Sequence, residues 1–350
     1  MVRTPDGISP KIGAIEMEHP VRSDVRVALC ETHPALRSGF QTALYRRGLR
    51  NIEVCKDSGA LITLLQNENI DLVICATDLP GLDFCDLIQQ IRHGNVGRNP
   101  FTLVLATVAD ATLDDIRRIM NAGVDRVAVK PMSMADMTAC VNALAVSRKP
   151  FVATESYVGP SRRGTARADQ RSDEAMDAPN TLHFKMTGAV PEQRLDLVIG
   201  QGRNDLISLR DRTTCLAVAR SSRRVTGQFH RHGAGAIARE LTRLHALSAT
   251  LESHYRASAD YYLSEVAANI SQLADLLLAF PAGQEGQMPV AVALLDKLGE
   301  VVRLAALGER QAMMTMRSII KSVQGFIGGL SAGSSVLFEA DTRWSGVSIN

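Results

Sequence analysis

Hydrophobic residues in the N-terminal part of the chain alternate between short continuous runs and longer segments with helical spacing. The short runs are rich in Val, Ile and Leu, and such continuous runs are typical of strands buried on both faces of a parallel sheet. They lie at residues 25–30, 52–55, 70–76, 101–107 and 126–129. The helical patterns lie between or after them, at residues 34–48, 58–67, 84–93, 113–122 and 133–145. This order predicts a doubly wound α/β domain with a five-stranded parallel sheet.

The pattern changes after residue 147, where large apolar residues become rare and Arg, Ser, Asp and Ala dominate. Such composition is typical of a mobile tether. From residue 205 the hydrophobic periodicity is helical. The helical segments lie at residues 206–229, 235–247, 249–280, 289–307 and 309–330, and they are interrupted by Gly233, Pro281-Ala-Gly and Gly308. Helices of this kind predict an all-α bundle. We therefore expect five parts: a flexible N-terminus (1–23), the α/β domain (24–147), a largely disordered linker (148–204), a helical domain (205–330) and a tail (331–350).

Composition sets the class of protein. The chain has 350 residues, enough for two domains, and its net charge of +2 is too small for the whole surface to bind a polyanion. Its six cysteines form no C-x-x-C pair and have no metal-ligand spacing, which predicts free thiols in a reducing compartment. No signal peptide and no run of about 18 apolar residues is found, so we expect a cytoplasmic protein without a membrane partner.

The ends of the predicted strands carry the candidate chemistry, because doubly wound sheets place their functional site beyond the carboxyl ends of the strands. Four segments lie at the ends of the first, third, fourth and fifth strands: Glu31-Thr32-His33-Pro34, Ala76-Thr77-Asp78-Leu79-Pro80-Gly81-Leu82-Asp83, Thr107, and Lys130-Pro131. In this order and with these spacings, residues 24–147 resemble the receiver domain of two-component response regulators, which has a flavodoxin-like fold. The C-terminal half resembles no family that we recognise.

The resemblance implies a phosphoryl-transfer site that this chain has lost in part. In the family, an aspartate at the end of the third strand accepts the phosphoryl group, an acidic pair holds Mg²⁺, and a Thr and a Lys stabilise the phosphoryl oxygens. The acceptor position falls on Ala76, which has no nucleophilic oxygen, and Thr32 replaces one of the metal-binding carboxylates. Val127 stands where the family has a switch aromatic. We therefore predict a pseudo-receiver with no catalytic residue, no metal and no cofactor.

The remaining residues of that site have structural interpretations. Asp78 could replace the acceptor, but its place on the turn favours a turn hydrogen bond. Lys130 is expected to form an ion pair with Glu31 or Asp78, and Thr107 is expected to have its hydroxyl satisfied at the strand end.

Two surfaces could bind partners. In the family, the face formed by the fourth helix, the fifth strand and the fifth helix binds proteins, and here it maps to residues 113–145. That segment contains four methionines, which suit contact surfaces but also fill cores: Met120, Met132, Met134 and Met137. In the helical half, four arginines could contact a polyanion or form a solvated face: Arg220, Arg223, Arg224 and Arg231.

These observations favour a non-enzymatic signalling adaptor that binds protein partners in a bacterial two-component pathway. A homodimer through the helical half remains open, because its Ala- and Ser-rich faces allow close helix packing. Two alternatives are a transcriptional or RNA-binding regulator that uses the arginines, and an enzyme in the helical half controlled by the receiver. No nucleophile and base pair, metal set or phosphate loop in the sequence supports the enzyme.

Overall fold

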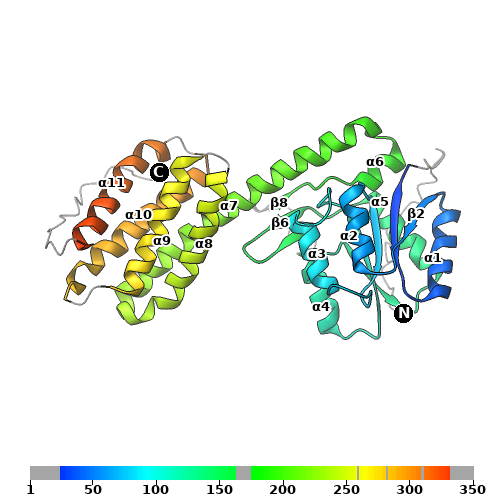
Figure 1. Ribbon diagram of the computed structural model, residues 1–350, viewed down its shortest axis with the longest axis horizontal. Coiled ribbons are helices and arrows are strands. Elements are labelled where there is room, and N and C mark those ends of the chain that lie inside the picture. Colours follow the sequence, from blue (N-terminus) through cyan, green and yellow to red (C-terminus); the bar gives the residue numbers. More distant parts are fainter. Residues whose placement is uncertain (1–23, 163–174, 258–259, 281–282, 309–310, 332–350) are drawn as a thin grey trace, which may run out of the picture. The chain divides into compact units, whose positions relative to one another are not determined.

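The computed structural model describes residues 24–162, 175–257, 260–280, 283–308 and 311–331 (Figure 1). It divides into two compact units, each of which is described here by itself. The first contains Met1–Pro150 and Asp177–Gly202, and the second contains Phe151–Met176 and Arg203–Asn350. The predicted N-terminus at 1–23 and, apart from Ser331, the predicted tail at 331–350 lie outside the described residues.

The first unit is built on a five-stranded parallel sheet, as the sequence predicts. Its strands run in the order β2-β1-β3-β4-β5. They are β1 (Arg26–Cys30), β2 (Asn51–Val54), β3 (Leu72–Ala76), β4 (Leu103–Ala109) and β5 (Arg126–Lys130). Every residue of β3 is buried, which explains the continuous hydrophobic run there. The two edge strands, β2 and β5, are more exposed.

Helices cover both faces of this sheet (Figure 1). They are α1 (Pro34–Arg46), α2 (Ser58–Asn67), α3 (Phe84–His93), α4 (Leu113–Ala122) and α5 (Met134–Val146). Buried residues of α1 and α5 share one core cluster, and those of α2, α3 and α4 share the other. Capping boxes fix where α4 and α5 begin, with Thr112 paired to Asp115 and Ser133 to Asp136.

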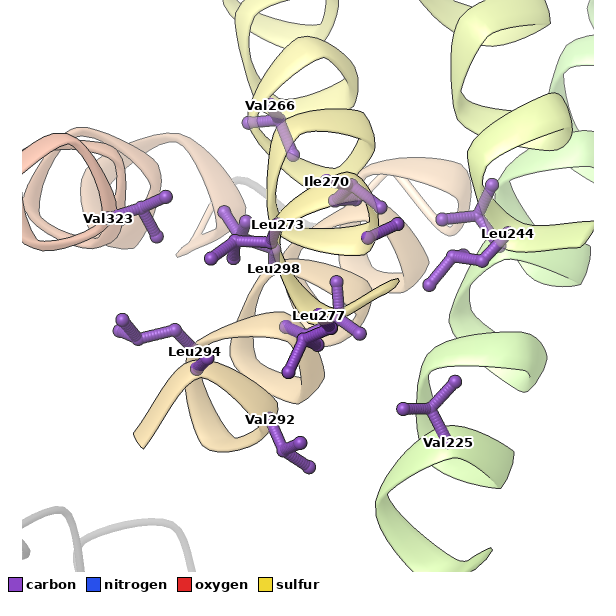
Figure 2. Close-up of a cluster of buried hydrophobic side chains, with 14 of the residues drawn as sticks. Val225, Leu244, Val266, Ile270, Leu273, Leu277, Val292, Leu294, Leu298 and Val323 are labelled. Atoms are coloured by element: carbon purple, nitrogen blue, oxygen red, sulfur yellow. The ribbon is translucent and has the colours of Figure 1, made fainter. Parts of the chain in front are cut away.

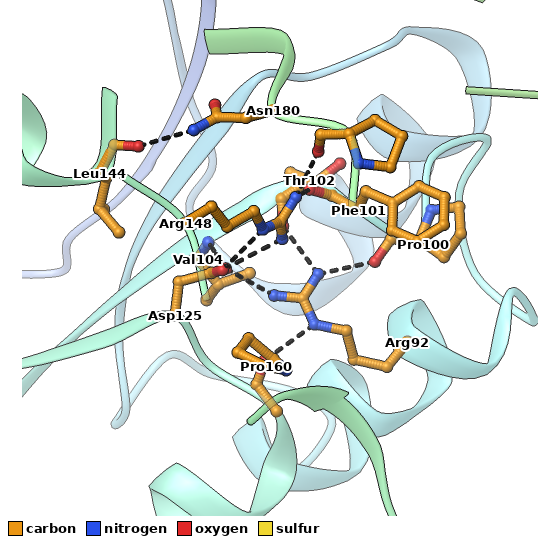
Figure 3. Close-up of polar contacts among 12 residues, drawn as sticks. Arg92, Pro100, Phe101, Thr102, Val104, Asp125, Leu144, Arg148, Pro160 and Asn180 are labelled. Atoms are coloured by element: carbon orange, nitrogen blue, oxygen red, sulfur yellow. Dashed lines mark hydrogen bonds and ion pairs between the residues drawn. The ribbon is translucent and has the colours of Figure 1, made fainter. Parts of the chain in front are cut away.

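A buried charge cluster joins the start of β5 to the end of α5 (Figure 3). Asp125 forms ion pairs with Arg92 at 2.8 Å and with Arg148 at 3.1 Å, and all three side chains are almost fully buried. Burial lowers the pKa of Arg148 to about 10, and Asp125 opposes that change. Arg92 also donates to the backbone oxygens of Pro100 and Thr102, both at 2.7 Å, so the guanidinium is satisfied on several sides.

The expectation of a largely disordered linker at residues 148–204 is wrong for its described part. Residues Asp177–Gly202 belong to the first unit and contain α6 (Thr181–Thr187) and the start of α7 (Glu192–His232). Lys185 forms a buried ion pair with Asp71 at 2.8 Å, and Arg148 donates to the oxygen of Pro179 at 2.6 Å. Because polar contacts to distant residues hold this segment, its composition resembles that of a tether.

The second unit begins with a small antiparallel sheet in the order β7-β6-β8. Its strands are β6 (Phe151–Ala153), β7 (Val158–Pro160) and β8 (Ala175–Met176). The prediction of a disordered linker missed these strands as well. Phe151 is fully buried, which orders residues whose surroundings in the sequence are polar. Arg243 reaches the hairpin and pairs with Glu155 at 2.7 Å.

The rest of the second unit is helical. It contains the C-terminal part of α7, then η2 (Ala234–Ala236), α8 (Ala238–Ala257), α9 (Tyr261–Leu278), η3 (Glu285–Gln287), α10 (Met288–Ala306) and α11 (Gln311–Ser331). Leu, Ile and Val side chains from these helices form its core, as Figure 2 shows for Leu244, Ile270 and Leu298. The predicted break between the segments 235–247 and 249–280 is wrong, because α8 runs through it without interruption. The second of these segments is divided later instead, where Asp260 caps α9 by accepting from the N–H of Leu263 at 3.2 Å. No described helix combines the length and the apolar character needed to cross a membrane.

Candidate functional site

The candidate site lies where β1, β3, β4 and β5 end. The register pairs Ala76 of β3 with Thr107 of β4, and Ala109 of β4 with Lys130 of β5. Glu31 directly follows Cys30, which pairs with Cys75 of β3. Parallel strands therefore bring the residues that the sequence singled out to one edge of the sheet.

A methyl group occupies the centre of this edge. Ala76 is fully buried, and its backbone oxygen accepts a hydrogen bond from the N–H of Leu79 at 3.2 Å. Next to it, the N–H of Thr77 donates to the oxygen of Thr107 at 3.0 Å. The backbone of the strand end is thus well ordered, but residue 76 offers no side-chain oxygen that could attack phosphorus.

Glu31 and Lys130 form the main polar contact of the site. Lys130 Nζ lies 2.7 Å from Glu31 Oε2, with the Glu31 side chain only 1% exposed and the Lys130 side chain 12% exposed. The other carboxylate oxygen of Glu31 accepts from the N–H of His33 at 3.0 Å. The predicted ion pair of Lys130 is confirmed with Glu31 as its partner, so each charge already has a counter-ion.

The other two site residues differ from their predicted roles. Thr107 was expected to have a satisfied hydroxyl, yet its Oγ1 is buried and has no hydrogen-bond partner in the described part of the chain. The residue beside it in the register is Ala76, whose methyl cannot accept a hydrogen bond. Asp78 is exposed, and its carboxylate makes no turn hydrogen bond with any described residue. The turn is held instead by the backbone bond from Leu79 to Ala76.

This donor set does not fit a divalent cation. Mg²⁺ prefers several oxygen ligands in octahedral geometry, usually including one or two carboxylates. Among the residues that the structure describes, Glu31 is the only buried carboxylate at the strand ends, and Lys130 already neutralises it. Thr32 is exposed and brings no carboxylate. Across the described ranges, no group of three or more His, Cys, Asp or Glu side chains is arranged to hold a metal ion.

The predicted partner face is only partly a surface. Met137 is fully buried in the core against α1, so its inclusion was wrong; its position faces the sheet because α5 packs there. Met120 and Met132 are partly buried against the two cores, as is Val127 at the predicted switch position. Met134 is 45% exposed.

Two further apolar side chains in the segment 113–145 are exposed, and the sequence reasoning overlooked them. Leu113 at the start of α4 is 73% exposed, and Val129 on β5 is 48% exposed. The sequence could have identified Val129 as exposed, because it lies on an edge strand, which is less covered than the central strands. We refer to Leu113, Val129 and Met134, the exposed apolar residues of this segment, as the β5 apolar face.

The basic residues of the second unit are largely matched by acids. Arg223 pairs with Glu300 at 2.6 Å, and Arg224 lies 3.6 Å from Glu240. Arg231 donates to the oxygen of Gly227 in its own helix at 2.9 Å. Arg220 is exposed. Two of the four predicted polyanion contacts are therefore already neutralised, and nothing in their arrangement favours nucleic acid over a solvated face.

Comparisons with known proteins agree on the first unit. Residues 27–142 match the family model of the response regulator receiver domain. The transcriptional activator protein PfeR of Pseudomonas aeruginosa is 32% identical over 119 residues, which cover 34% of this chain and 37% of that protein. The sensor protein GacS of Pseudomonas syringae is 28% identical over 128 residues, which cover 36% of this chain and 14% of GacS. The chain thus spans well under half the length of these two relatives.

Among solved structures, one similar chain is the receiver domain of the sensor histidine kinase PA1611 from Pseudomonas aeruginosa PAO1, determined with a magnesium ion in its active-site cleft. It is 22% identical, with a TM-score of 0.30, and the similarity covers 33% of this chain and 93% of that one. The family match does not extend into the helices of the second unit.

Proposed function

Residues 27–142 form a response regulator receiver domain, and on that premise we propose that this chain is a signalling adaptor in a bacterial two-component pathway. Its receiver acts through protein contacts and does not accept a phosphoryl group. The proposal assigns no enzymatic activity to the chain. The observation that carries it is the buried methyl of Ala76, at the same edge of the sheet as a lysine that is already paired with Glu31.

The charges of the site support this proposal. A carboxylate that attacks a phosphoryl group needs a divalent cation and a fixed ammonium group to offset the developing charge. Here the carboxylate is missing at residue 76, the cation has too few ligands, and Lys130 is held at 2.7 Å by Glu31. Each of the three parts of the reaction is absent or engaged elsewhere.

The first experiment tests phosphoryl transfer. The full chain is incubated with acetyl phosphate and Mg²⁺, and its intact mass is measured before and after mild base treatment. We expect no base-labile phosphoryl adduct. An adduct that maps to Asp78, the exposed carboxylate nearest the strand end, would refute the proposal.

A pair of variants separates the missing nucleophile from the missing metal ligand. Ala76→Asp alone should be phosphorylated poorly, because Thr32 still supplies no carboxylate. Ala76→Asp combined with Thr32→Asp should be phosphorylated much faster. Equal rates for the single and double variants would show that Glu31 alone supports metal binding, contrary to our assignment.

The second experiment tests the contact surface. Val129 on β5 and Val54 on β2 are exposed valines on the two opposite edges of the same sheet. We expect Val129→Glu to abolish cross-linking of the full chain to its signalling partner and Val54→Glu to leave it intact. The opposite result would place the partner on the β2 edge and would exclude the β5 apolar face.

A further inference from the structure

Three of the six cysteines lie in one row across the sheet. Cys30 ends β1, and its Cα is the register partner of Cys75 in β3. On the other side of β1, Leu29 is paired with Val54, the last residue of β2. The N–H of Cys55 donates to the oxygen of Leu29 at 3.0 Å, which continues this ladder by one residue. Cys55, Cys30 and Cys75 are therefore consecutive neighbours from β2 through β1 to β3.

The three thiols are neighbours in the core. The thiols of Cys55 and Cys75 both raise the pKa of the Cys30 thiol. All three side chains belong to the core cluster under α2 and α3, and Cys55, at 3% exposed, is the least deeply buried. Neighbouring strands lie about 4.8 Å apart, and disulfides bridge Cα atoms that are about 4.4–6.8 Å apart. A disulfide across this row therefore needs no large backbone movement.

The row is chemically asymmetric. The neighbouring Cys30 thiol lowers the pKa of Cys55, although burial opposes this change. The thiols of Cys55 and Cys75, together with burial, raise the pKa of Cys30 well above its ordinary value. Because the thiolate is the reactive form of cysteine, Cys55 is suited to react first and Cys30 to react second.

We propose that Cys55 and Cys30 are a redox-sensitive pair that forms a reversible disulfide in the presence of a peroxide. The Cys55 thiolate attacks one oxygen of hydrogen peroxide, the O–O bond breaks, hydroxide leaves, and Cys55 becomes a sulfenic acid. The Cys30 sulfur then attacks the Cys55 sulfur, the S–O bond breaks, and water leaves with the thiol proton. Two thiols lose two electrons in total, and the peroxide gains them.

The row lies directly beneath the candidate site. Cys30 precedes Glu31 and Cys75 precedes Ala76, so the thiols occupy the last layer of the sheet before the strand ends. A bond between Cys30 and Cys55 would draw the end of β1 toward the residue after β2 and would displace Glu31 relative to Lys130. The pair therefore offers an input to the receiver that requires no phosphoryl group. The disulfide itself does not depend on the adaptor function proposed above.

The chain offers a direct test, because trypsin separates the three thiols. Cleavage places Cys30 in residues 27–37, Cys55 in residues 51–56, and Cys75 together with Cys85 in residues 57–92. The reduced full chain is treated with graded hydrogen peroxide, its remaining thiols are blocked with an alkylating agent, and the unreduced digest is analysed by mass spectrometry. We expect a peptide that links residues 27–37 to 51–56 and disappears after reduction with dithiothreitol.

Matched thiols and variants keep the test decisive. Cys85, Cys140 and Cys215 are also buried and free, and they should stay alkylatable when the pair is oxidised. Cys30→Ala should leave a sulfenic acid on Cys55 that dimedone labels, whereas Cys140→Ala should form the disulfide as the wild type does. Absence of the linked peptide, a link from Cys30 to residues 57–92, or equal oxidation of all six cysteines would overturn the proposal. The wild-type digest decides these outcomes even if Cys30→Ala does not fold.

Discussion

The buried ion pair between Lys185 and Asp71 gives the sharpest test of how residues 177–202 join the first unit. Lys185 Nζ lies 2.8 Å from Asp71 Oδ2, with side-chain exposures of 6% and 2%. The same carboxylate oxygen accepts from the N–H of Arg26 at 2.8 Å, and Lys185 also donates to the oxygen of Asp24 at 2.9 Å. The pair therefore ties α6 to the starts of β1 and β3.

Replacing Lys185 with Met should strongly destabilise this unit. Removing one partner of a buried pair leaves an uncompensated charge and typically costs about 3–5 kcal/mol. For a unit of this size, such a loss corresponds to a fall in Tm of about 6–20 °C. Asp71→Asn combined with Lys185→Met removes both charges and should recover most of the loss.

The effect of Lys185→Met should also depend on pH. Burial raises the pKa of Asp71, and the charge and hydrogen bond of Lys185 oppose that rise. A carboxylate whose pKa is higher in the folded state binds its proton more tightly there, so the free energy of unfolding falls as pH rises from the unfolded to the folded pKa. Without Lys185 the folded pKa rises further and this window widens. The cost of the substitution should therefore be largest at neutral pH and smaller in mild acid.

Hydrogen exchange measures this cost in the first unit alone, which matters because two units need not unfold together. Exchange of the buried β3 amides (Leu72–Ala76) would be compared between the wild type, Lys185→Met and Lys149→Met, which removes an exposed lysine of the same unit. If Lys185→Met exchanges like Lys149→Met at neutral pH, the pair does not stabilise the unit and our reasoning is wrong.

Two further predictions concern the candidate site and the helical core. Lys130→Met should lower the stability of the first unit by about 3 kcal/mol in urea unfolding, since it leaves Glu31 buried without a counter-ion. Adding Glu31→Gln to the same chain should restore most of that stability. An unchanged unfolding midpoint for Lys130→Met would contradict the ion pair. Gly299→Ala in α10 should destabilise the second unit by about 1–3 kcal/mol, because the new Cβ would lie 2.6 Å from Ser222 Cβ of α7. Gly328→Ala in α11, with no atom within 4 Å of the added Cβ, should instead stabilise it slightly. Thermal unfolding that shows the same sign for both glycines would disprove the close helix approach.

Local pattern was enough to predict most of the first unit. Continuous apolar runs located all five strands within a few residues, because a strand buried on both faces must be apolar at every position, as β3 is. Strand order alone was enough to predict that Glu31, Ala76, Thr107 and Lys130 lie at one edge of the sheet. The break in the predicted helix at 249–280 was missed, because Asp260 reads as one polar residue in a helical pattern until its cap to Leu263 is seen.

The sequence by itself determined that residue 76 cannot attack phosphorus, that the sheet is parallel and that the second half is helical, because these depend on side-chain chemistry and on short-range periodicity. Only the tertiary structure decided that Lys130 pairs with Glu31 and not Asp78, that Met137 is buried, and that residues 177–202 dock on the first unit. The same holds for the row formed by Cys55, Cys30 and Cys75. Each of these facts depends on contacts between residues distant in sequence, and no local pattern specifies which distant groups will meet.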